Sequence, residues 1–190
     1  VVRAALVRNP SVPDVILKML AADENINVRA AVAAKVTAPD VLETFVKDPA
    51  WRVRYSLGSN LELPETILTL LASDTDRRVR YTVAVHSSTP PEILTLLADD
   101  EVDIDQAIAA NPNTPIDVLL SLLGRAETTD IVENVLTNSH VPVSVLEQFS
   151  THSEPEFRCS VAMNVSTPLS VLKKLTADEN KNVAVAANET

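Results

Sequence analysis

Apolar residues recur along the chain at two fixed places in a unit of about 26 residues. At the first place an apolar marker is followed four positions later by a second apolar residue, as at Val53 and Leu57. At the second place, as after Pro64, an apolar pair lies three and four positions beyond a proline and another apolar residue lies seven beyond it. Such spacing forms one face of an α-helix, so the pattern predicts two short helices per unit. The markers are Val2, Val28, Val53, Val79, Ile104, Ile131, Phe157 and Val183.

Helices this short are marginal alone, because an isolated helix needs about 12–15 residues to be stable in water. They persist when each unit stacks on the units before and after it, which is the organisation of a solenoid. The sequence therefore predicts an all-α solenoid of about seven two-helix repeats, with residues 1–190 as a single helical-repeat domain. Because the chain starts inside the pattern and without Met, we expect a fragment of a longer array or a domain embedded in one.

The residues between the helices predict how each helix begins and ends. Proline suits a first helical position, where its missing N–H costs nothing. A threonine directly before it, as at Thr89, Thr114 and Thr167, is expected to supply the N-cap oxygen. Since the chain has only two Gly, the asparagine that recurs seven positions after the marker is expected to take the left-handed position that ends a helix. This position holds Asn9, Asn60, Asn111, Asn138 and Asn164, with Lys35 and His86 as exceptions.

The repeat has the form V-R-x-x-V-A-x-N-P-x-x-P-x-x-V-L-x-x-L-A-x-D, as in VRAALVRNPSVPDVILKMLAAD and, with substitutions, IDQAIAANPNTPIDVLLSLLG. Its period is shorter than that of tetratricopeptide, HEAT or armadillo repeats. Over essentially all 190 residues the chain resembles the leucine-rich repeat variant (LRV) family, whose repeats are HEAT-like. The resemblance implies α-helices alternating with shorter, partly 3₁₀ helices in a right-handed superhelix, and a binding scaffold. Some family members have a Cys-rich iron–sulfur segment, which this sequence lacks, so no cofactor is expected.

Composition and charge restrict the setting and the partner. The single Cys159 excludes a disulfide framework within the chain, and a reducing, cytoplasmic location is the natural interpretation. No apolar run is long enough to span a membrane, and no signal peptide is present. Residues 1–95 hold 11 Lys/Arg and 11 Asp/Glu, whereas residues 96–190 hold 5 and 15. The whole net charge of −10 thus lies in the second half, which disfavours nucleic acid as its partner.

An aspartate column and an arginine column run through the repeats. Within a repeat the arginine follows the aspartate by six residues, which does not place them on one helix face. We expect each turn aspartate to cap a helix and to pair with the arginine of the neighbouring repeat, as a structural ladder; the alternative is that the arginine row binds a ligand. The two columns include Asp23 and Arg29, Asp48 and Arg54, Asp74 and Arg80, and also Arg3, Asp99, Arg158 and Asp178.

The ladder is interrupted in the middle of the chain. Asp105 replaces the arginine, and Ala126 and His152 replace the aspartate in the next two repeats. The interpretation is drift in a tolerant array, and the alternative is a bend or an acidic docking face. The spacing and the missing Gly argue against a calcium loop.

Aromatic and basic residues cluster in two adjacent repeats, in DPAWRVRYSLGSN and DTDRRVRYTVAVH. Trp, Tyr and Arg are the residues enriched in binding hot spots. The sequence predicts a partner-binding patch on one side of these repeats, facing an acidic or aromatic-accepting partner; the alternative is partly buried packing with arginine stacked on the rings. The patch consists of Trp51, Arg52, Tyr55, Arg77, Arg78 and Tyr81.

No catalytic chemistry is indicated by the motifs. His86, His140, His152 and Cys159 match no zinc spacing, and no nucleophile elbow or phosphate-binding loop is present. We predict a non-enzymatic scaffold, without metal, that binds a protein or peptide on the solenoid surface. The alternative is a HEAT-like nucleic-acid-binding module of the DNA-repair type, which would need a continuous basic groove. Further expectations are end-to-end self-association and a spacer role within a larger protein.

Overall fold

The computed structural model describes residues 3, 6, 7, 9, 11–98 and 100–190. Within these residues the chain forms fourteen α-helices and no strand, so the predicted all-α repeat solenoid is confirmed. Val2 and Asp99, which belong to the marker and aspartate columns, lie outside the described residues.

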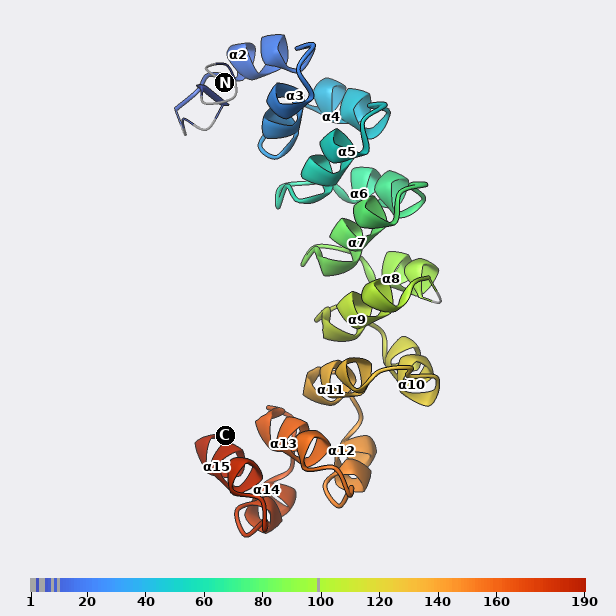
Figure 1. The fold of residues 1–190 in the computed structure, drawn as a ribbon, viewed down its shortest axis with the longest axis vertical. Coiled ribbons are helices and arrows are strands. Elements are labelled where there is room, and N and C mark those ends of the chain that lie inside the picture. Colours follow the sequence, from blue (N-terminus) through green and yellow to red (C-terminus); the bar gives the residue numbers. More distant parts are fainter. Residues whose placement is uncertain (1–2, 4–5, 8, 10, 99) are drawn as a thin grey trace. The chain divides into compact units, whose positions relative to one another are not determined.

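Each repeat contributes two helices, and Figure 1 shows them alternating along the chain. The first helices are α2 (Asp14–Leu20), α4 (Pro39–Val46), α6 (Glu65–Ala72), α8 (Pro91–Leu97), α10 (Ile116–Gly124), α12 (Val143–Phe149) and α14 (Leu169–Leu175). The second helices are α3 (Ile26–Ala33), α5 (Trp51–Gly58), α7 (Arg77–Val85), α9 (Val102–Ala110), α11 (Thr129–Thr137), α13 (Pro155–Met163) and α15 (Lys181–Glu189). Both kinds are α-helical in the described part of the chain, so the 3₁₀ helices implied by the resemblance are not observed.

By its internal contacts the chain divides into a first unit, residues 1–97, and a second unit, residues 98–190. In the first unit α3 packs on α5 and α5 on α7, while α4 packs on α6 and α6 on α8. In the second unit α9, α11, α13 and α15 pack in succession. The expected single-domain organisation stays a prediction.

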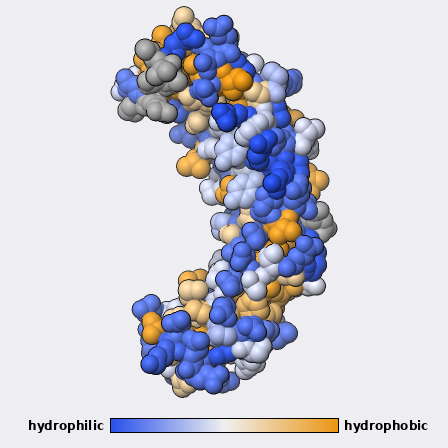
Figure 2. Space-filling model, in the orientation of Figure 1, coloured by the Kyte–Doolittle hydropathy of each residue, from blue (hydrophilic) through white to orange (hydrophobic). Residues whose placement is uncertain are grey.

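The core of each unit is built from the two apolar columns. The markers Val53 and Ile104 are fully buried, as are Leu68 and Leu119 after the prolines. Each helix therefore buries one stripe against its own repeat and its neighbours, which is why helices of seven to nine residues persist. The surface visible in Figure 2 is mainly hydrophilic, with small separate apolar areas. No helix in the described ranges is long and apolar enough to cross a membrane.

The predicted helix starts need a correction. Most of the prolines, such as Pro64 and Pro115, hold the N-cap position, and the helix begins one residue later. The preceding threonine does not cap: the hydroxyl of Thr114 is buried and donates to the carbonyl oxygen of Ile108 at 2.6 Å. Thr89 and Thr167 bond in the same way to Val83 and Val161. The threonine thus adds a second hydrogen bond to a carbonyl oxygen in the last turn of the preceding second helix, which also accepts a backbone N–H, and this is the opposite terminus from the one expected.

The expectation for the asparagine column is also wrong. Asn111, Asn138 and Asn164 have φ of −72°, −68° and −76° with extended ψ, so none takes the left-handed conformation. Their side chains instead point inward: Asn138 is buried, and its Nδ2 donates to the carbonyl oxygens of Ala109 and Asn111, both at 2.9 Å. Its Oδ1 accepts from the backbone N–H of His140 at 3.0 Å.

These bonds form an asparagine ladder, in which each side chain joins its own turn to the turn of the preceding repeat. Asn164 donates to Leu136 and Asn138, and Asn60 donates to Val36 and, at 3.4 Å, to Ala33. An extended backbone ends α7, α9, α11 and α13, and the side chain in the asparagine column pairs the polar groups that this turn buries.

His86 and Lys35, the two exceptions in the asparagine column, also supply a side-chain N–H donor. His86 is buried in the asparagine position, with Nε2 3.0 Å from the carbonyl oxygen of Asn60, and its Nδ1 accepts from the backbone N–H of Ser88. Because a backbone N–H can only donate, Nδ1 is the unprotonated ring nitrogen and Nε2–H the donor. Lys35 donates Nζ to the carbonyl oxygen of Val7 at 3.0 Å. The column therefore requires a side-chain N–H more strictly than it requires an amide.

Gly58 allows α5 and α7 to approach closely. A Cβ at Gly58 would lie 1.9 Å from Oγ1 and 2.9 Å from Cβ of Thr82, which is buried on α7. Because Gly58 has no side chain, α5 and α7, which begin at Trp51 and Arg77, can lie this close together.

The asparagine ladder predicts a large loss of stability for Asn138→Leu. The substitution removes the side-chain bonds to the carbonyl oxygen of Ala109 and the N–H of His140 in a buried turn, each loss costing about 1–3 kcal/mol, while the carbonyl oxygen of Asn111 keeps the N–H of Thr114. We expect the free energy of unfolding to fall by about 3 kcal/mol or more, measured by urea unfolding monitored by circular dichroism. Asn182→Leu, on the exposed start of α15, is the matched control and should change it by less than about 0.5 kcal/mol.

Urea unfolding of His86→Asn and His86→Leu tests whether the side-chain N–H donor or the imidazole ring as such is needed at this position. Asparagine restores a donor and an acceptor at this position, so we expect a change below about 1 kcal/mol, whereas leucine should resemble Asn138→Leu. Equal losses for the two His86 variants would contradict the ladder.

Candidate functional site

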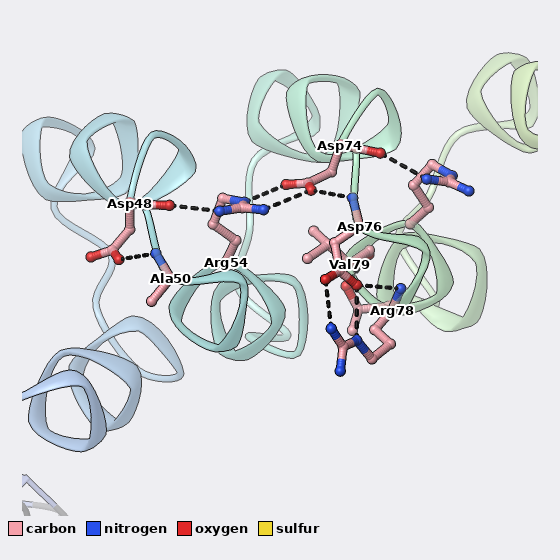
Figure 3. A network of polar contacts seen from close by, with 9 residues as sticks. Asp48, Ala50, Arg54, Asp74, Asp76, Arg78 and Val79 are labelled. Atoms are coloured by element: carbon pink, nitrogen blue, oxygen red, sulfur yellow. Dashed lines mark hydrogen bonds and ion pairs between the residues drawn. The ribbon is translucent and has the colours of Figure 1, made fainter.

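An arginine on the second helix bridges two successive turns. Arg54 on α5 forms two parallel bonds with the Asp74 carboxylate of the next repeat, Nε to Oδ2 at 2.6 Å and Nη2 to Oδ1 at 3.0 Å. Its Nη1 donates to the main-chain carbonyl of Asp48, in its own repeat, at 2.7 Å, as Figure 3 shows. The same bidentate geometry occurs in the pairs Arg3–Asp23, Arg29–Asp48 and Arg158–Asp178.

The aspartate of each pair also orders its own turn. Oδ1 of Asp74 accepts from the backbone N–H of Asp76 at 2.8 Å, and Asp48 accepts likewise from Ala50 at 2.9 Å. The side chains of Asp74 and Arg54 are only 6% and 14% exposed. Burial of two charges is unfavourable unless hydrogen bonds offset it, and here every nitrogen of the guanidinium group is bonded within the array. This geometry suits joining repeats rather than binding a ligand.

Arg80, the last arginine of the column in the first unit, repeats part of this arrangement. Its Nη1 donates to the main-chain carbonyl of Asp74 at 2.8 Å. The arginine hydrogen bonds also act on the acids: they lower the pKa of Asp23, through Arg3, and the pKa of Asp178, through Arg158.

In the second unit one rung is reversed rather than lost. Asp105, in the arginine column on α9, is buried and accepts from Arg125 in the turn after α10, with Nη1 to Oδ2 at 2.8 Å and Nη2 to Oδ1 at 3.2 Å. Asp105 in place of the arginine, which from the sequence alone indicates drift, is therefore compensated by Arg125, one residue before Ala126. At the following turn His152 replaces the aspartate: its Nδ1 accepts from the N–H of Glu154, and its ring stacks on Phe149 at 5.4 Å.

Four of the six predicted patch residues lie together at the start of α5 and α7. The rings of Trp51 and Tyr55 meet edge to face, with centroids 6.2 Å apart. The guanidinium of Arg78 lies over the Trp51 ring, with Cζ 3.4 Å from the centroid, and Cζ of Arg52 lies 5.7 Å from it. Arg78 is oriented by Asp76, with Nη2 to Oδ2 at 2.7 Å and Nε to Oδ1 at 2.9 Å.

The remaining patch residues, Arg77 and Tyr81, lie on α7, and both are exposed. Tyr55 and Tyr81 are 38% and 36% exposed, and within the described ranges Tyr81 makes no contact with another ring. Arg78 stacked on Trp51 agrees with the alternative interpretation, in which the aromatic rings are partly buried and covered by arginine. The exposed tyrosines and Arg52 are what a binding surface needs, so the patch has a fixed base and an accessible rim.

Beside the patch lies an open depression of about 560 Å³, here called the Ile26–Trp51 depression. It is lined by Glu24, Asn25, Ile26, Asn27, Ala50, Trp51 and Arg52. Its walls come from the starts of α3 and α5, and Ile26 is 43% exposed. The sequence pattern did not indicate it, because it lies between residues from two repeats.

The corresponding surface of the second unit is acidic. Asp130, Glu133 and Glu156 lie on α11 and α13, where the first unit has the aromatic and basic residues. A smaller depression there contains the half-buried Cys159. Burial raises the pKa of the Cys159 thiol, and the nearby carboxylates of Glu133 and Glu156 add to this effect, so the thiol stays protonated and unreactive at neutral pH.

All three histidines form hydrogen bonds with the turns of the repeats. His86 belongs to the asparagine ladder, His152 caps a turn, and His140 has Nδ1 3.4 Å from the carbonyl oxygen of Thr114. Among the described residues, no three His, Cys, Asp or Glu side chains are grouped to hold a metal ion.

Paired short helices with repeating buried polar ladders define a helical repeat protein. Among solved structures the chain is similar to one described as "a leucine-rich repeat variant with a novel repetitive protein structural motif", at 25% identity and a TM-score of 0.65, over 93% of this chain and 71% of that one. No family model and no curated protein matches the chain. The predicted resemblance to a leucine-rich repeat variant is thus confirmed by structure.

The reversed rung predicts that charge reversal at both positions is tolerated better than at either. Asp105→Arg places two guanidinium groups together, and we expect the free energy of unfolding to fall by about 3–5 kcal/mol. Arg125→Asp alone brings two carboxylates together, with a similar loss. The double variant restores opposite charges, and a double-mutant cycle by urea unfolding should recover at least half of the summed loss. A double variant as unstable as that sum would show that the pair contributes nothing.

Asp76→Asn tests the support of Trp51 through pH. Asparagine still accepts from the backbone N–H of Arg78 but loses the ion pair. The Arg78 hydrogen bond lowers the pKa of Asp76 from 3.8 to about 2, so its stabilisation is complete above about pH 4 and is lost as the pH falls through about 2. Since Arg78 is half exposed, we expect a loss of about 0.5–1 kcal/mol at pH 7 that vanishes near pH 2, measured by urea unfolding. Glu43→Gln, at an exposed position of α4, is the control, and a pH-independent loss would contradict the role of the pair.

Proposed function

We propose that this chain is a non-enzymatic interaction scaffold of the cytoplasm that binds a protein or peptide through the second-helix surface of its first unit. The observation that supports this most is Trp51, which is held between its own helix and Arg78 while Tyr55, Tyr81 and Arg52 beside it stay exposed. A fixed aromatic anchor surrounded by accessible polar groups is the composition of a binding hot spot.

The charge of this surface favours an acidic partner. Arg52 forms no ion pair within the described part of the chain, so its guanidinium is available to a carboxylate. The acidic second unit gives no support to the nucleic-acid alternative, because phosphate binding requires an excess of Lys and Arg.

The experiment is affinity capture with three forms of the chain. The Trp51→Ala, Tyr81→Ala variant removes two of the three aromatic side chains of the patch, one from α5 and one from α7, and Leu70→Ala, 53% exposed on α6, is the matched control outside it. We expect a captured protein that the native chain and the control retain and that the double variant loses, with binding by the purified partner weakened at least about tenfold in calorimetry.

Circular dichroism must show that the double variant is folded. Equal retention of every captured protein by all three forms would disprove the patch. Firm retention on heparin that weakens steeply with salt would favour nucleic acid instead.

A further inference from the structure

The Ile26–Trp51 depression has the character of a slot for one apolar side chain. Its apolar lining residues are Ile26 from one repeat and Ala50 and Trp51 from the next. In the neighbouring second helices the N-cap residue is Asn25 or Asp76, whose side chain folds over the helix start, whereas Ala50 has no side chain to do so. Apolar pockets with a few placed polar groups are the usual form of a recognition site.

The slot is already formed without a partner. Arg78 covers the Trp51 ring at 3.4 Å and is itself fixed by two bonds to Asp76, so the indole does not need to be ordered on binding. A preformed wall avoids the entropic cost of immobilising a large side chain.

Two charged side chains line the depression. Arg52 is exposed and forms no ion pair among the described residues, and Glu24 is exposed as well. The remaining polar side chains of the lining, Asn25 and Asn27, are uncharged. A carboxylate next to the inserted side chain is attracted by Arg52 and repelled by Glu24, so we expect it to lie beside Arg52.

We infer that the Ile26–Trp51 depression binds an apolar side chain of a peptide together with an adjacent Asp or Glu side chain, whose carboxylate pairs with Arg52. This inference rests on the proposed function and specifies the chemistry of its partner: an extended acidic segment with one apolar anchor.

A random peptide display library selected on the native chain tests this directly. We expect enriched peptides to share one large apolar residue within two positions of an Asp or Glu. In the strongest peptide, synthesised with an amidated C-terminus, replacing the anchor with Ala or the acid with its amide should each weaken binding about tenfold or more in calorimetry. If only the free C-terminal form binds, the ligand is a terminal carboxylate and the side-chain inference is wrong.

Protein variants locate the two contacts. Ile26→Ser should weaken binding of the native peptide about tenfold, and Leu70→Ser, on the exposed face of α6, should not change it. Arg52→Gln should weaken the acidic peptide but leave its amide form unchanged, because the pair is then already broken.

The outcomes separate this inference from the proposed function. Peptides that depend on Trp51 and Tyr81 but share no apolar–acidic pattern, or that require Lys or Arg, overturn the inference alone. Peptides that bind the Trp51→Ala, Tyr81→Ala variant as well as the native chain overturn both. A library from which nothing is enriched also overturns the inference.

Discussion

The hydrogen bonds that cross from one repeat to the next are the constraint on which each unit depends. Two helices joined by tight turns expose a short apolar stripe and a set of unpaired backbone groups, and stacking buries both. Apolar contact satisfies the stripe, but a buried carbonyl without a partner would cancel much of that gain. Asn138 and its equivalents supply donors in the turns that follow the second helices, and Arg54 and its equivalents supply them in the turns that follow the first helices.

These ladders leave the exposed face of the second helices free to vary. The buried columns are occupied by residues that hold the array together, while residues such as Tyr55 and Glu133 stand in one repeat position with opposite chemical character. The first unit uses this freedom for an aromatic and basic surface, and the second for an acidic one. The proposed binding surface belongs to this variable face, on which Arg78 lies over the Trp51 ring.

Much of the fold was predictable because burial in a repeat protein is periodic. The marker column and the proline column located both helices of every repeat, and the pairing of Arg29 with Asp48 was anticipated from their spacing. The purpose of the asparagine was not, although a signal existed: Lys35 and His86, its replacements, both possess a side-chain N–H and neither favours a left-handed turn. Arg125 was missed because it compensates Asp105 from outside the column, and only proximity in space relates the two.

The sequence by itself determined the class of fold, the repeat length, the position of the helices and the separation of charge, since each follows from residue type and spacing along the chain. The tertiary structure decided which way each side chain at a turn points, that Arg78 rather than another arginine covers Trp51, and that Ile26 and Trp51 enclose a depression. These features depend on the distance between neighbouring repeats, which Gly58 and Thr82 help to set, and no periodicity within one repeat encodes that distance.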